Sequence, residues 1–405
     1  MAQQKPLRVV VTTRLFAPEV GAAAFRLKAL VDGLVEQGAD VTVITTKLPA
    51  GSPDLQVSYT LRRWPVLRDS GGYVRGYIQY LSFDIPAFFR LLATRADVVV
   101  SEPPPTTGIV VALSSLLRRR PYVYYAADIW TEALSAMSVP GAVKAAMRAV
   151  EGFVLRRAAL VLAVSEPVAG KVAAFGVPGA RIKVVGNGVD TTVFRPDAPS
   201  ANAAKRYFVY TGTMSEWQGA GIFIEALGTV REEFPDAEIR FLGQGTDEAH
   251  LKDLAATIVP GAVHFGGVVP PEEAAAWIRG AAGALVSIKP GQGYDFAKPT
   301  KIYAAAACGT PVVFAGRGDG ATLVTENELG IAAGYTTAAV ASAMRTLLAE
   351  PGLSGPGQSE PGLAATPDQG RAHRIQWALD NASLQASGRL AAGEVLLAGT
   401  TTSSP

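Results

Sequence analysis

Short runs of β-branched and other apolar residues recur along this chain, and each run is followed by a turn and then by a stretch with helical spacing. The first run is Leu7 to Thr13; a loop containing Pro18 and a helix from about Ala23 to Gln37 follow, and Ala39 to Thr46 is the next run. Such runs are typical of strands buried on both faces of a parallel sheet. The order therefore predicts a doubly wound α/β sheet, whose ligands lie at the carboxyl ends of the strands.

The alternation continues through the first half of the chain and then starts again at Tyr207. Because 405 residues are too many for one core, we expect two Rossmann-like domains that face each other across a cleft. Further strands are predicted near Leu55 to Trp64 and at Asp97 to Ser101, Tyr122 to Ala126 and Leu160 to Ser165, and helices at Tyr73 to Thr94 and Val143 to Ala158.

The domain boundaries follow from these two series. We place the N-terminal domain at residues 1–190 and the C-terminal domain at residues 191–370. Residues 351–370 are rich in Gly, Pro and Ser, which predicts a flexible surface excursion. Residues 371–405 return to helical spacing, and we expect a C-terminal helix that crosses back over the first domain, followed by a disordered tail.

Composition excludes several classes of protein. Cys308 is the single cysteine, so no internal disulfide can form, and its place in an alanine-rich helix favours a small buried side chain over a reactive thiol. Three scattered histidines give no metal-ligand cluster, and we expect no metal and no other cofactor. Residues 1–6 run directly into a strand, which argues against a signal peptide, and charged residues interrupt every long apolar run. A cytoplasmic protein is predicted.

The net charge of +2 hides an asymmetry. Residues 1–190 hold 22 Lys and Arg against 14 Asp and Glu, a net charge of +8, whereas the remainder holds 15 against 21, a net charge of −6. Aromatic residues beside arginines in the basic half suit an anionic membrane surface or an anionic acceptor, and a solvated face over an ordinary core is an equal alternative. Dispersed basic residues argue against nucleic acid. The aromatic and basic residues are Tyr73, Arg75, Tyr77, Tyr80, Phe83, Phe88, Phe89, Arg90 and Arg95.

The stretch from Tyr294 to Val313 has the composition of an anion site. Prolines and a glycine break the backbone before it, so that Lys298 and Thr300 fall in a loop that leads into the first turn of a helix. The unpaired N–H groups of that turn, with Lys298 and Lys301 beside them, suit a phosphate. The helix itself, Ile302 to Cys308, is almost all alanine and can pack closely against a neighbour. An ordinary loop and helix with solvated lysines is the alternative.

Two loops of the first half follow predicted strands and offer small or acidic residues. Gly21 and Ala22 would let a ligand approach backbone N–H groups, and a plain tight turn fits equally well. Glu102 opens a rigid turn of three prolines at the point where a strand end would meet a cleft. Both loops are therefore candidates for contact with an acceptor.

A pair of carboxylates follows the strand that ends at Ala126. Asp128 and Glu132 stand four residues apart, with Trp130 between them as a stacking face. Carboxylates so placed hydrogen-bond sugar hydroxyls or take part in proton transfer. The alternative is a helix that Asp128 caps, with Glu132 in its first turns.

Several short motifs lie between the predicted strands and helices, and the Gly-x-Gly-x-x-Gly fingerprint of dinucleotide sites is absent. The motifs are Val164-Ser165 with Asn187-Gly-Val-Asp190 and Phe194-Arg-Pro196, Tyr210-Thr-Gly212, Phe241-Leu-Gly-Gln-Gly245, Pro299-Thr-Lys-Ile-Tyr303 and Gly309-Thr-Pro-Val-Val313. Together they resemble the GT-B glycosyltransferases, and within them the family 4 group of retaining enzymes that use nucleotide sugars. Pro18 with Gly21 to Arg26, and Asp128 to Glu132, resemble a branch that often glycosylates lipid-linked acceptors in bacterial envelope synthesis.

The resemblance implies that the donor's nucleoside diphosphate sits on the second domain and that the first domain holds the acceptor. It also implies catalysis without a metal, because helix ends and cationic side chains neutralise the diphosphate. Matched position by position, it assigns catalysis to Asp128, Glu132 and Asp295, donor binding to Gly212, Thr213, Gln218, Gly219, Gly243, Lys298, Thr300 and Lys301, and acceptor binding to Gly21, Ala22, Glu102 and Trp130.

Several positions depart from the family's pattern. Thr213 and Gln218 stand where the family usually has an Arg and a Lys that grip the phosphates. Ala304 stands where a glutamate normally binds the donor ribose, and only Asp295 lies near the position of the other acidic residue. Ala127 replaces a histidine that often precedes the first-domain aspartate.

We therefore expect a glycosyltransferase that moves a sugar from a nucleotide donor to an acceptor hydroxyl, lipid-linked or in a cell-envelope glycan, with retention of configuration. The departures support an alternative, a GT-B-like binding or scaffold protein without turnover. A nucleotide-sugar epimerase on the same fold fits less well, because the clustered His and Glu that such chemistry needs are missing. The basic first domain predicts peripheral association with the inner face of the plasma membrane.

Overall fold

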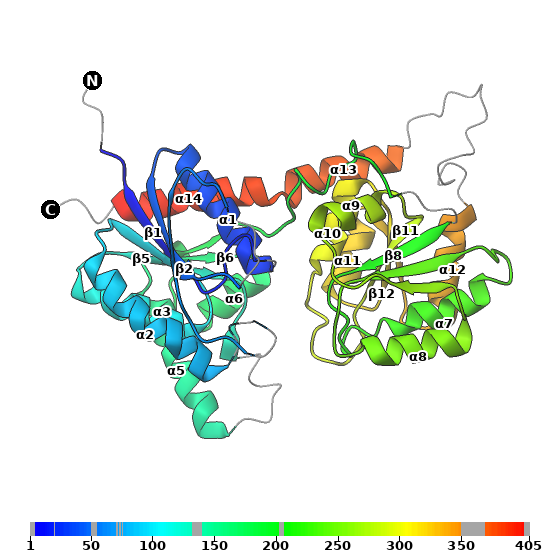
Figure 1. The fold of residues 1–405 in the computed structure, drawn as a ribbon, viewed down its shortest axis with the longest axis horizontal. Coiled ribbons are helices and arrows are strands. Elements are labelled where there is room, and N and C mark those ends of the chain that lie inside the picture. The colour runs from blue at the N-terminus through cyan, green and yellow to red at the C-terminus, as the bar shows by residue number, and fades with distance from the viewer. Residues whose placement is uncertain are drawn as a thin grey trace. The chain divides into compact units, whose positions relative to one another are not determined.

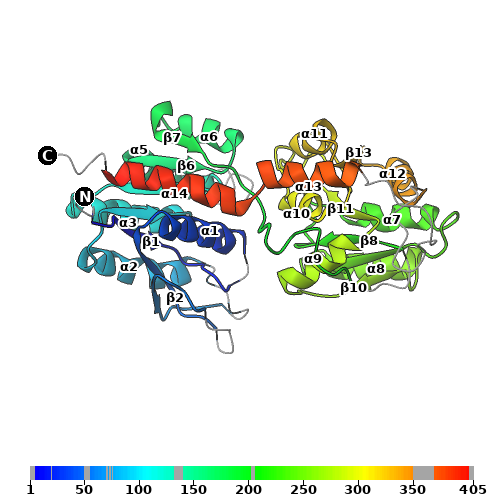
Figure 2. The same cartoon turned by 90° about the horizontal axis from the view of Figure 1, so that it is seen from above.

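The computed structural model describes residues 5–19, 21–49, 55–69, 72, 74, 76–131, 140–201, 206–349 and 369–400. They form two units, Met1–Asn187 with Leu384–Pro405, and Gly188–Ser383; the sequence pattern predicted the end of the first domain at residue 190. Three of the residues named above, Tyr73, Arg75 and Glu132, lie outside the described residues, as does most of the stretch 351–370. Each unit is built on one parallel sheet (Figure 1 and Figure 2).

The first sheet has seven strands in the order β3-β2-β1-β4-β5-β6-β7, and every pairing is parallel. Val9 in β1 pairs with Val41 of β2 on one side and with Val98 of β4 on the other, and its side chain is fully buried in the core under α1 and α14. From β1 the chain winds toward one edge, and from β4 it winds toward the other, so the strand order switches between β1 and β4. The strands are β1 (Arg8–Thr12), β2 (Asp40–Thr46), β3 (Thr60–Trp64), β4 (Val98–Ser101), β5 (Tyr122–Ala126), β6 (Leu160–Ala163) and β7 (Ile182–Val184).

Helices cover both faces of the first sheet (Figure 2). One face packs against α1 and α14 through side chains such as Leu30 and Val395, and the other packs against α2, α3, α5 and α6 through side chains such as Leu91 and Val154. The helices are α1 (Ala22–Glu36), α2 (Tyr77–Ala93), α3 (Pro105–Leu117), α5 (Gly141–Arg157), α6 (Glu166–Ala173) and α14 (Leu384–Thr400), with a 3-10 turn at η1 (Gly179–Arg181).

The last helix, α14, lies along α1 at unusually close range (Figure 2). A Cβ atom added to Gly388 would come within 2.3 Å of the carbonyl oxygen of Ala29, and one added to Gly33 would come within 2.8 Å of the carbonyl oxygen of Gly388. Glycine at both positions lets the two backbones approach each other, and Arg389 forms an ion pair with Glu36 at 2.7 Å near the helix ends. The predicted return of a C-terminal helix to the first domain is confirmed.

The second sheet has six parallel strands in the order β10-β9-β8-β11-β12-β13. Its strand order switches between β8 and β11. The strands are β8 (Tyr207–Thr211), β9 (Glu238–Leu242), β10 (Val263–Phe265), β11 (Gly283–Ser287), β12 (Val312–Ala315) and β13 (Gly330–Ala333). The helices are α7 (Gly221–Val230), α8 (Glu248–Ile258), α9 (Pro271–Arg279), α10 (Thr300–Cys308), α11 (Asp319–Glu326), α12 (Thr337–Ala349) and α13 (Gln369–Asn381).

The alanine-rich helix α10 is buried along almost its whole length. Every residue from Ile302 to Cys308 is buried, and Gly309 ends the helix with a φ of 79°. Helix α13 packs on it, and Arg374 Nε donates a hydrogen bond to the carbonyl oxygen of Gly309 at 3.0 Å. Both sheets have the doubly wound arrangement that the sequence predicts. Among the described residues, no helix has both the length and the apolar character needed to cross a bilayer.

Candidate functional site

In the first unit, the switch in strand order brings the loops after β1 and β4 together. Thr13 Oγ1 donates a hydrogen bond to Glu102 Oε1 at 2.6 Å, and Arg26 from α1 reaches Glu102 Oε2 at 3.1 Å. All three residues are buried, with exposed fractions of 5% or less. The carboxylate that we expected to contact an acceptor is thus paired with two protein groups, and it holds α1 against the carboxyl ends of β1 and β4.

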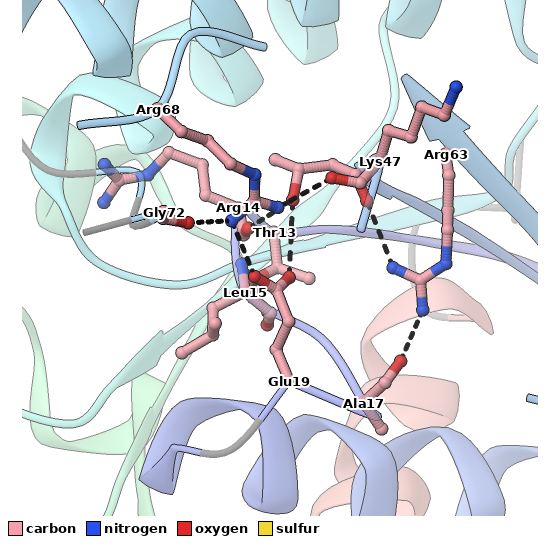
Figure 3. Close-up of polar contacts among 10 residues, drawn as sticks. Thr13, Arg14, Leu15, Ala17, Glu19, Lys47, Arg63, Arg68 and Gly72 are labelled. Atoms are coloured by element: carbon pink, nitrogen blue, oxygen red, sulfur yellow. Dashed lines mark hydrogen bonds and ion pairs between the residues drawn. The ribbon is translucent and has the colours of Figure 1, made fainter. Parts of the chain in front are cut away.

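The loop after β1 is braced by arginines from the segment that follows β2 (Figure 3). Arg68 forms an ion pair with Glu19 at 2.8 Å and donates to the carbonyl oxygen of Lys47 at 2.7 Å. Arg63 donates to the carbonyl oxygens of Thr46 and Ala17. Glu19 and Ala17 of this loop are therefore held by the segment that contains β3, for which the sequence pattern predicted one strand near Leu55 to Trp64 and no such role.

After β5, the loop with Asp128 and Trp130 is held in place by Glu151 of α5. The N–H groups of Trp130 and Thr131 donate to the two oxygens of Glu151 at 2.8 and 2.9 Å, and the Thr131 hydroxyl adds a further bond. Glu151 is only 1% exposed, so it works as an internal acceptor for this loop. The ring of Trp130 meets Tyr80 edge-on, with ring centroids 6.1 Å apart.

Asp128 is exposed at the carboxyl end of β5. Partial loss of water around the carboxyl raises its pKa, Arg26 counteracts part of that effect, and the negative charge of Glu151 adds to it. The carboxyl is therefore biased toward holding a proton or toward accepting hydrogen bonds from a bound ligand. Its predicted companion, Glu132, lies outside the described residues.

Gly21 and Ala22 begin α1, as the sequence pattern suggested. Gly21 occupies the N-cap position without a side-chain hydrogen bond, and no acidic residue lies in the first turn. A Cβ at Gly21 would come within 2.8 Å of Leu15 Cδ2. The first N–H groups of this helix are thus close to the braced loop 14–19.

In the second unit, the loops after β8 and β9 interlock. Gly212 has a φ of 96° and Gly243 has a φ of 138°, values that favour glycine. A Cβ at Gly243 would lie 2.0 Å from the carbonyl oxygen of Gly212. The N–H of Gly212 donates to Leu242 at 2.7 Å and that of Met214 to Gln244 at 3.1 Å. These contacts fix the backbone beside the switch between β8 and β11.

Lys301, in the first turn of α10, points into this corner. Its Nζ donates to the carbonyl oxygen of Thr213 at 3.2 Å and lies 3.5 Å from the centre of the Tyr210 ring. No carboxylate pairs with Lys301 among the described residues. Burial lowers the pKa of its ammonium group well below the ordinary value. A cation held by one carbonyl and one ring face is poised to meet an anion.

Gln218 and Gly219 support the turn after β8. Gln218 is 6% exposed, and its Oε1 accepts hydrogen bonds from the Tyr210 hydroxyl and the Ser215 N–H, both at 3.1 Å. Gly219, with a φ of 63°, accepts through its carbonyl oxygen a hydrogen bond from the Tyr335 hydroxyl at 2.7 Å. Gln218 therefore stands beneath the turn, whereas the resemblance assigned it to donor binding.

The loop after β11 carries the other predicted donor residues. Oδ1 of Asp295 is buried and has no hydrogen-bond partner among the described residues. Lys298 is exposed, and Thr300 opens α10 after Pro299, with no side-chain cap on the helix. Ala304 lies one turn further along and is 5% exposed. Asp295 Oδ1 is therefore an unpaired acceptor, and the first N–H groups of α10 are donors that no side chain caps. Like Lys301, both follow the carboxyl end of β11.

Three groups that shape these sites were not predicted from the sequence. Glu151 lies within the predicted helix Val143 to Ala158 and Arg68 follows β3, and no role was predicted for either residue. Trp217 stacks on Tyr294 at a centroid distance of 4.3 Å and, through its carbonyl oxygen, joins the loops after β8 and β11 by accepting from Lys289 N–H at 2.9 Å. An aromatic residue just before the Gln218-Gly219 pair was the available signal for this contact.

Two family models match the chain, one on each unit. The Glycosyl transferase 4-like domain matches residues 21–188, and the Glycosyl transferases group 1 model matches residues 205–350. The chain belongs to the GT-B glycosyltransferases of family 4. The resemblance carried by the short motifs is thereby confirmed, and the two matched ranges include nearly all the candidate residues described above.

Known proteins that are similar to this chain include glycosyltransferases. A D-inositol 3-phosphate glycosyltransferase of Acidothermus cellulolyticus is 30% identical over 198 residues, covering 44% of this chain and 43% of that protein. The chain thus spans less than half the length of the curated relatives it matches. WaaG, a glycosyltransferase involved in lipopolysaccharide biosynthesis, has the same fold with a TM-score of 0.68 at 14% identity over 96% of this chain and 99% of WaaG. HepE of Anabaena in complex with UDP-glucose gives a TM-score of 0.65 at 14% identity over 96% of this chain and all of that chain.

Proposed function

We propose that this glycosyltransferase transfers a sugar from a nucleotide-sugar donor to an acceptor hydroxyl, with retention of anomeric configuration. The observation that carries the proposal is Lys301, a partly buried ammonium group with no carboxylate partner among the described residues, at the strand-order switch of the second sheet. Ligands of doubly wound sheets bind at such switches. Membership of family 4 and the UDP-glucose bound to HepE support a nucleoside diphosphate as the anion.

The second unit would hold the donor. Lys301, Lys298 and the free N–H groups at the start of α10 would neutralise the diphosphate, next to the glycine turns at Gly212 and Gly243. The unpaired Oδ1 of Asp295 would accept a hydrogen bond from a sugar or ribose hydroxyl. These groups stabilise negative charge on the leaving diphosphate without requiring a metal.

The first unit would hold the acceptor. Asp128 and Trp130 follow β5 and offer a carboxylate and an aromatic face for a sugar, and Glu132 is proposed as their partner. Glu102 would act indirectly, by positioning Arg26 through their 3.1 Å ion pair. A lipid-linked or cell-envelope glycan as acceptor is supported by the resemblance of this unit and by the lipopolysaccharide role of WaaG. Such an acceptor, together with the basic charge of residues 1–190, places the enzyme at the inner face of the plasma membrane in this proposal.

Calorimetric titration with UDP-, GDP- and other nucleotide sugars tests the donor site. Binding of at least one of them, lost in Lys301→Met, is expected; absence of binding to every one at millimolar concentration would sink the proposal. With the donor identified, the anomeric configuration of the transferred sugar in the product, determined by NMR, tests retention.

A second candidate is a binding protein on the same fold that no longer turns over. Ala304, 5% exposed in a packed helix, stands where the family's ribose-binding glutamate is expected, which favours this candidate. Lys301→Met separates the two hypotheses: a transferase loses sugar transfer, whereas the partner binding of a scaffold is unchanged. An epimerase would isomerise the donor in the absence of acceptor, which incubation of the donor alone detects.

A further inference from the structure

The first unit contains a cavity of about 280 Å³ that takes no part in the candidate site. It lies at the carboxyl-terminal ends of α3 and α5, and Tyr122, the first residue of β5, forms part of its wall. Asp128 follows the opposite end of that strand. The cavity is lined by Ala112, Ser115, Leu116, Arg119, Arg120, Pro121, Tyr122, Phe153, Arg157 and Ala159.

The polar groups of this cavity are hydrogen-bond donors without acidic partners. Three arginines and no Asp or Glu line it. Arg119 and Arg157 are exposed, and neither forms an ion pair within the described part of the chain. Arg120 is fixed by the carbonyl oxygens of Leu91 and Thr94 at 2.8 Å, which leaves its buried Nε unpaired. Ser115 is 1% exposed, and its hydroxyl also lacks a partner.

Arginines at the ends of helices often serve the helix itself, by meeting its last carbonyl groups. Arg156 has a similar role at the end of a neighbouring helix, because its guanidinium donates to the carbonyl oxygen of Phe175, just after α6, at 3.1 Å. Arg157, the next residue, lies instead 5.9 Å from the centre of the Phe153 ring inside the cavity wall. The arginines of the cavity therefore carry positive charge that no carboxylate in the cavity lining neutralises.

The cavity opens beside apolar side chains that are exposed to solvent. Leu116 lines the cavity and is itself 57% exposed, and Leu117 next to it is 65% exposed. Helix α2 lies beside α3 on the same face of the sheet and adds a stripe of exposed residues at helical spacing. We call these residues the α2–α3 face: Ile78, Leu81, Ile85 and Phe89 of α2 with Leu113, Leu116 and Leu117 of α3.

The two helices form one surface because they are tied together at both ends. Thr107 of α3 donates to the buried Asp84 of α2 at 2.6 Å, and Arg120 reaches the last turn of α2. Asp84 is the single acidic residue of the two helices and is 1% exposed. The α2–α3 face therefore presents apolar side chains and, at one end, arginines, with no exposed negative charge from either helix.

We propose that the cavity binds the phosphate of an anionic phospholipid while the α2–α3 face enters the apolar region of the bilayer. An amphiphile is the occupant whose two parts match this surface, because the exposed leucines adjoin the cationic cavity directly. The inference rests on the membrane association proposed above and specifies its site; it does not depend on sugar transfer.

Flotation of the full-length protein with vesicles of phosphatidylcholine, with and without phosphatidylglycerol, tests the charged part. Binding is expected only with phosphatidylglycerol. Arg157→Gln should weaken it about fivefold, and Arg119→Gln with Arg157→Gln about 25-fold, following the contribution of one arginine near an anionic surface. Arg148→Gln is the matched control, since Arg148 is exposed on the same helix α5 but outside the cavity; a change within about twofold is expected.

The apolar part is tested by Leu117→Asn, which should weaken vesicle binding about tenfold, the scale of one leucine leaving an apolar phase. Leu397→Asn is its control, because Leu397 is 61% exposed on α14, which covers the other face of the sheet. Equal losses for cavity and control variants would overturn the proposal. So would binding of inorganic phosphate to the cavity with no partition onto vesicles, which would indicate a site for a free anion.

Nucleotide-sugar titration of the same variants keeps the two proposals separable. Arg157→Gln and Leu117→Asn should bind the donor as the unmodified protein does, because neither residue belongs to the donor site. If no nucleotide sugar binds but the vesicle results hold, sugar transfer is refuted and the lipid site stands; the opposite pattern refutes the lipid site alone.

Discussion

Lys301 brings a positive charge into a corner of the second unit, where its ammonium group contacts the carbonyl oxygen of Thr213 and the face of the Tyr210 ring. A desolvated charge without a counter-ion costs stability, and the cost is recovered when an anion binds. Active sites commonly retain such groups at the expense of stability. The residue therefore links the stability of the free protein to its affinity for a nucleotide.

Replacing Lys301 with methionine should change stability and binding in opposite directions. We expect Lys301→Met to raise the free energy of unfolding by about 1 kcal/mol, because a desolvated ammonium group is removed, and to abolish nucleotide-sugar binding. Urea denaturation and calorimetric titration measure the two effects. Lys298→Met is the control for stability: Lys298 is exposed, so a change within about 0.5 kcal/mol is expected. A destabilised Lys301→Met protein would contradict this account.

The lowered pKa of Lys301 also predicts a pH dependence. Between that pKa and the ordinary value of 10.5, the unfolded chain keeps a proton that the folded protein has released. The free energy of unfolding should therefore rise with pH through this window. Affinity for the nucleotide should fall over the same window, since the anion needs the protonated ammonium. Both pH trends should disappear in Lys301→Met; parallel trends in the variant would assign them to another group.

For single residues, the sequence indicated which residue types lie at the site, but not the contacts that depend on the fold. Lys301 and Thr300 were predicted beside an anion because a proline and a helix start are local signals. Glu151 was missed, since the N–H groups that it accepts from lie 20 residues away and only the fold brings them together. Donor contact by Gln218 stays a prediction; its side-chain oxygen accepts hydrogen bonds from the Tyr210 hydroxyl and the Ser215 N–H, which the sequence did not indicate.

At the scale of elements, two glycines determine how α1 and α14 meet. Neither Gly33 nor Gly388 has a positive φ. Glycine is needed at these positions because a side chain would not fit between the helices, not because the backbone conformation requires it. The helices touch through backbone atoms at this point, which commits α14 to one register along α1.

Gly388→Ala should separate the two helices. Its methyl group would lie 2.3 Å from a backbone oxygen of Ala29 that cannot rotate away, so we expect a loss of about 1–3 kcal/mol in the free energy of unfolding. Gly393→Ala is the matched control on the same helix, where the added methyl group would lie 3.6 Å from its nearest neighbour, Gln37 Oε1; alanine there should leave stability unchanged or raise it by up to about 1 kcal/mol. Chemical denaturation of both variants decides the point. Equal effects would refute the close backbone contact.

Most strands and helices followed from local pattern, but the end of the chain did not. The alanine helix was placed at 302–308 and begins at Thr300, a difference of the first turn alone. Residues 371–395 looked like one helix because apolar spacing continues from Leu379 to Leu384. The structure ends α13 at Asn381 and starts α14 at Leu384, and the two helices pack on different units. That division depends on which core each helix covers, and no local signal encodes it.

At the scale of the molecule, the first unit is built from two distant stretches of chain. Residues of α14, among them Ala391 and Val395, are fully buried in the same core as β1 and α1. The second unit, Gly188–Ser383, is continuous in sequence. The two cores should therefore respond differently to changes at the C-terminus.

Removal of residues 384–405 should unfold the first unit and spare the second. Without α14, apolar side chains such as Leu30 lose their cover, and the loss exceeds the usual stability of a domain. Limited proteolysis with mass spectrometry should then show rapid cleavage within residues 5–187 and protection of residues 206–349. A chain shortened only by residues 401–405 serves as control and should resist proteolysis throughout. Protection of both units in the longer deletion would show that α14 is dispensable.

The close seat of α14 on α1 also has a consequence for biosynthesis. A chain emerges from the ribosome with its N-terminus first, and domains generally fold in that order. Here the strands and helices of the first unit leave the ribosome early, but one side of their core stays open until α14 has been synthesised. The second unit, complete by Ser383, can close first. The first half of this chain must therefore wait, partly assembled, until α14 has been translated.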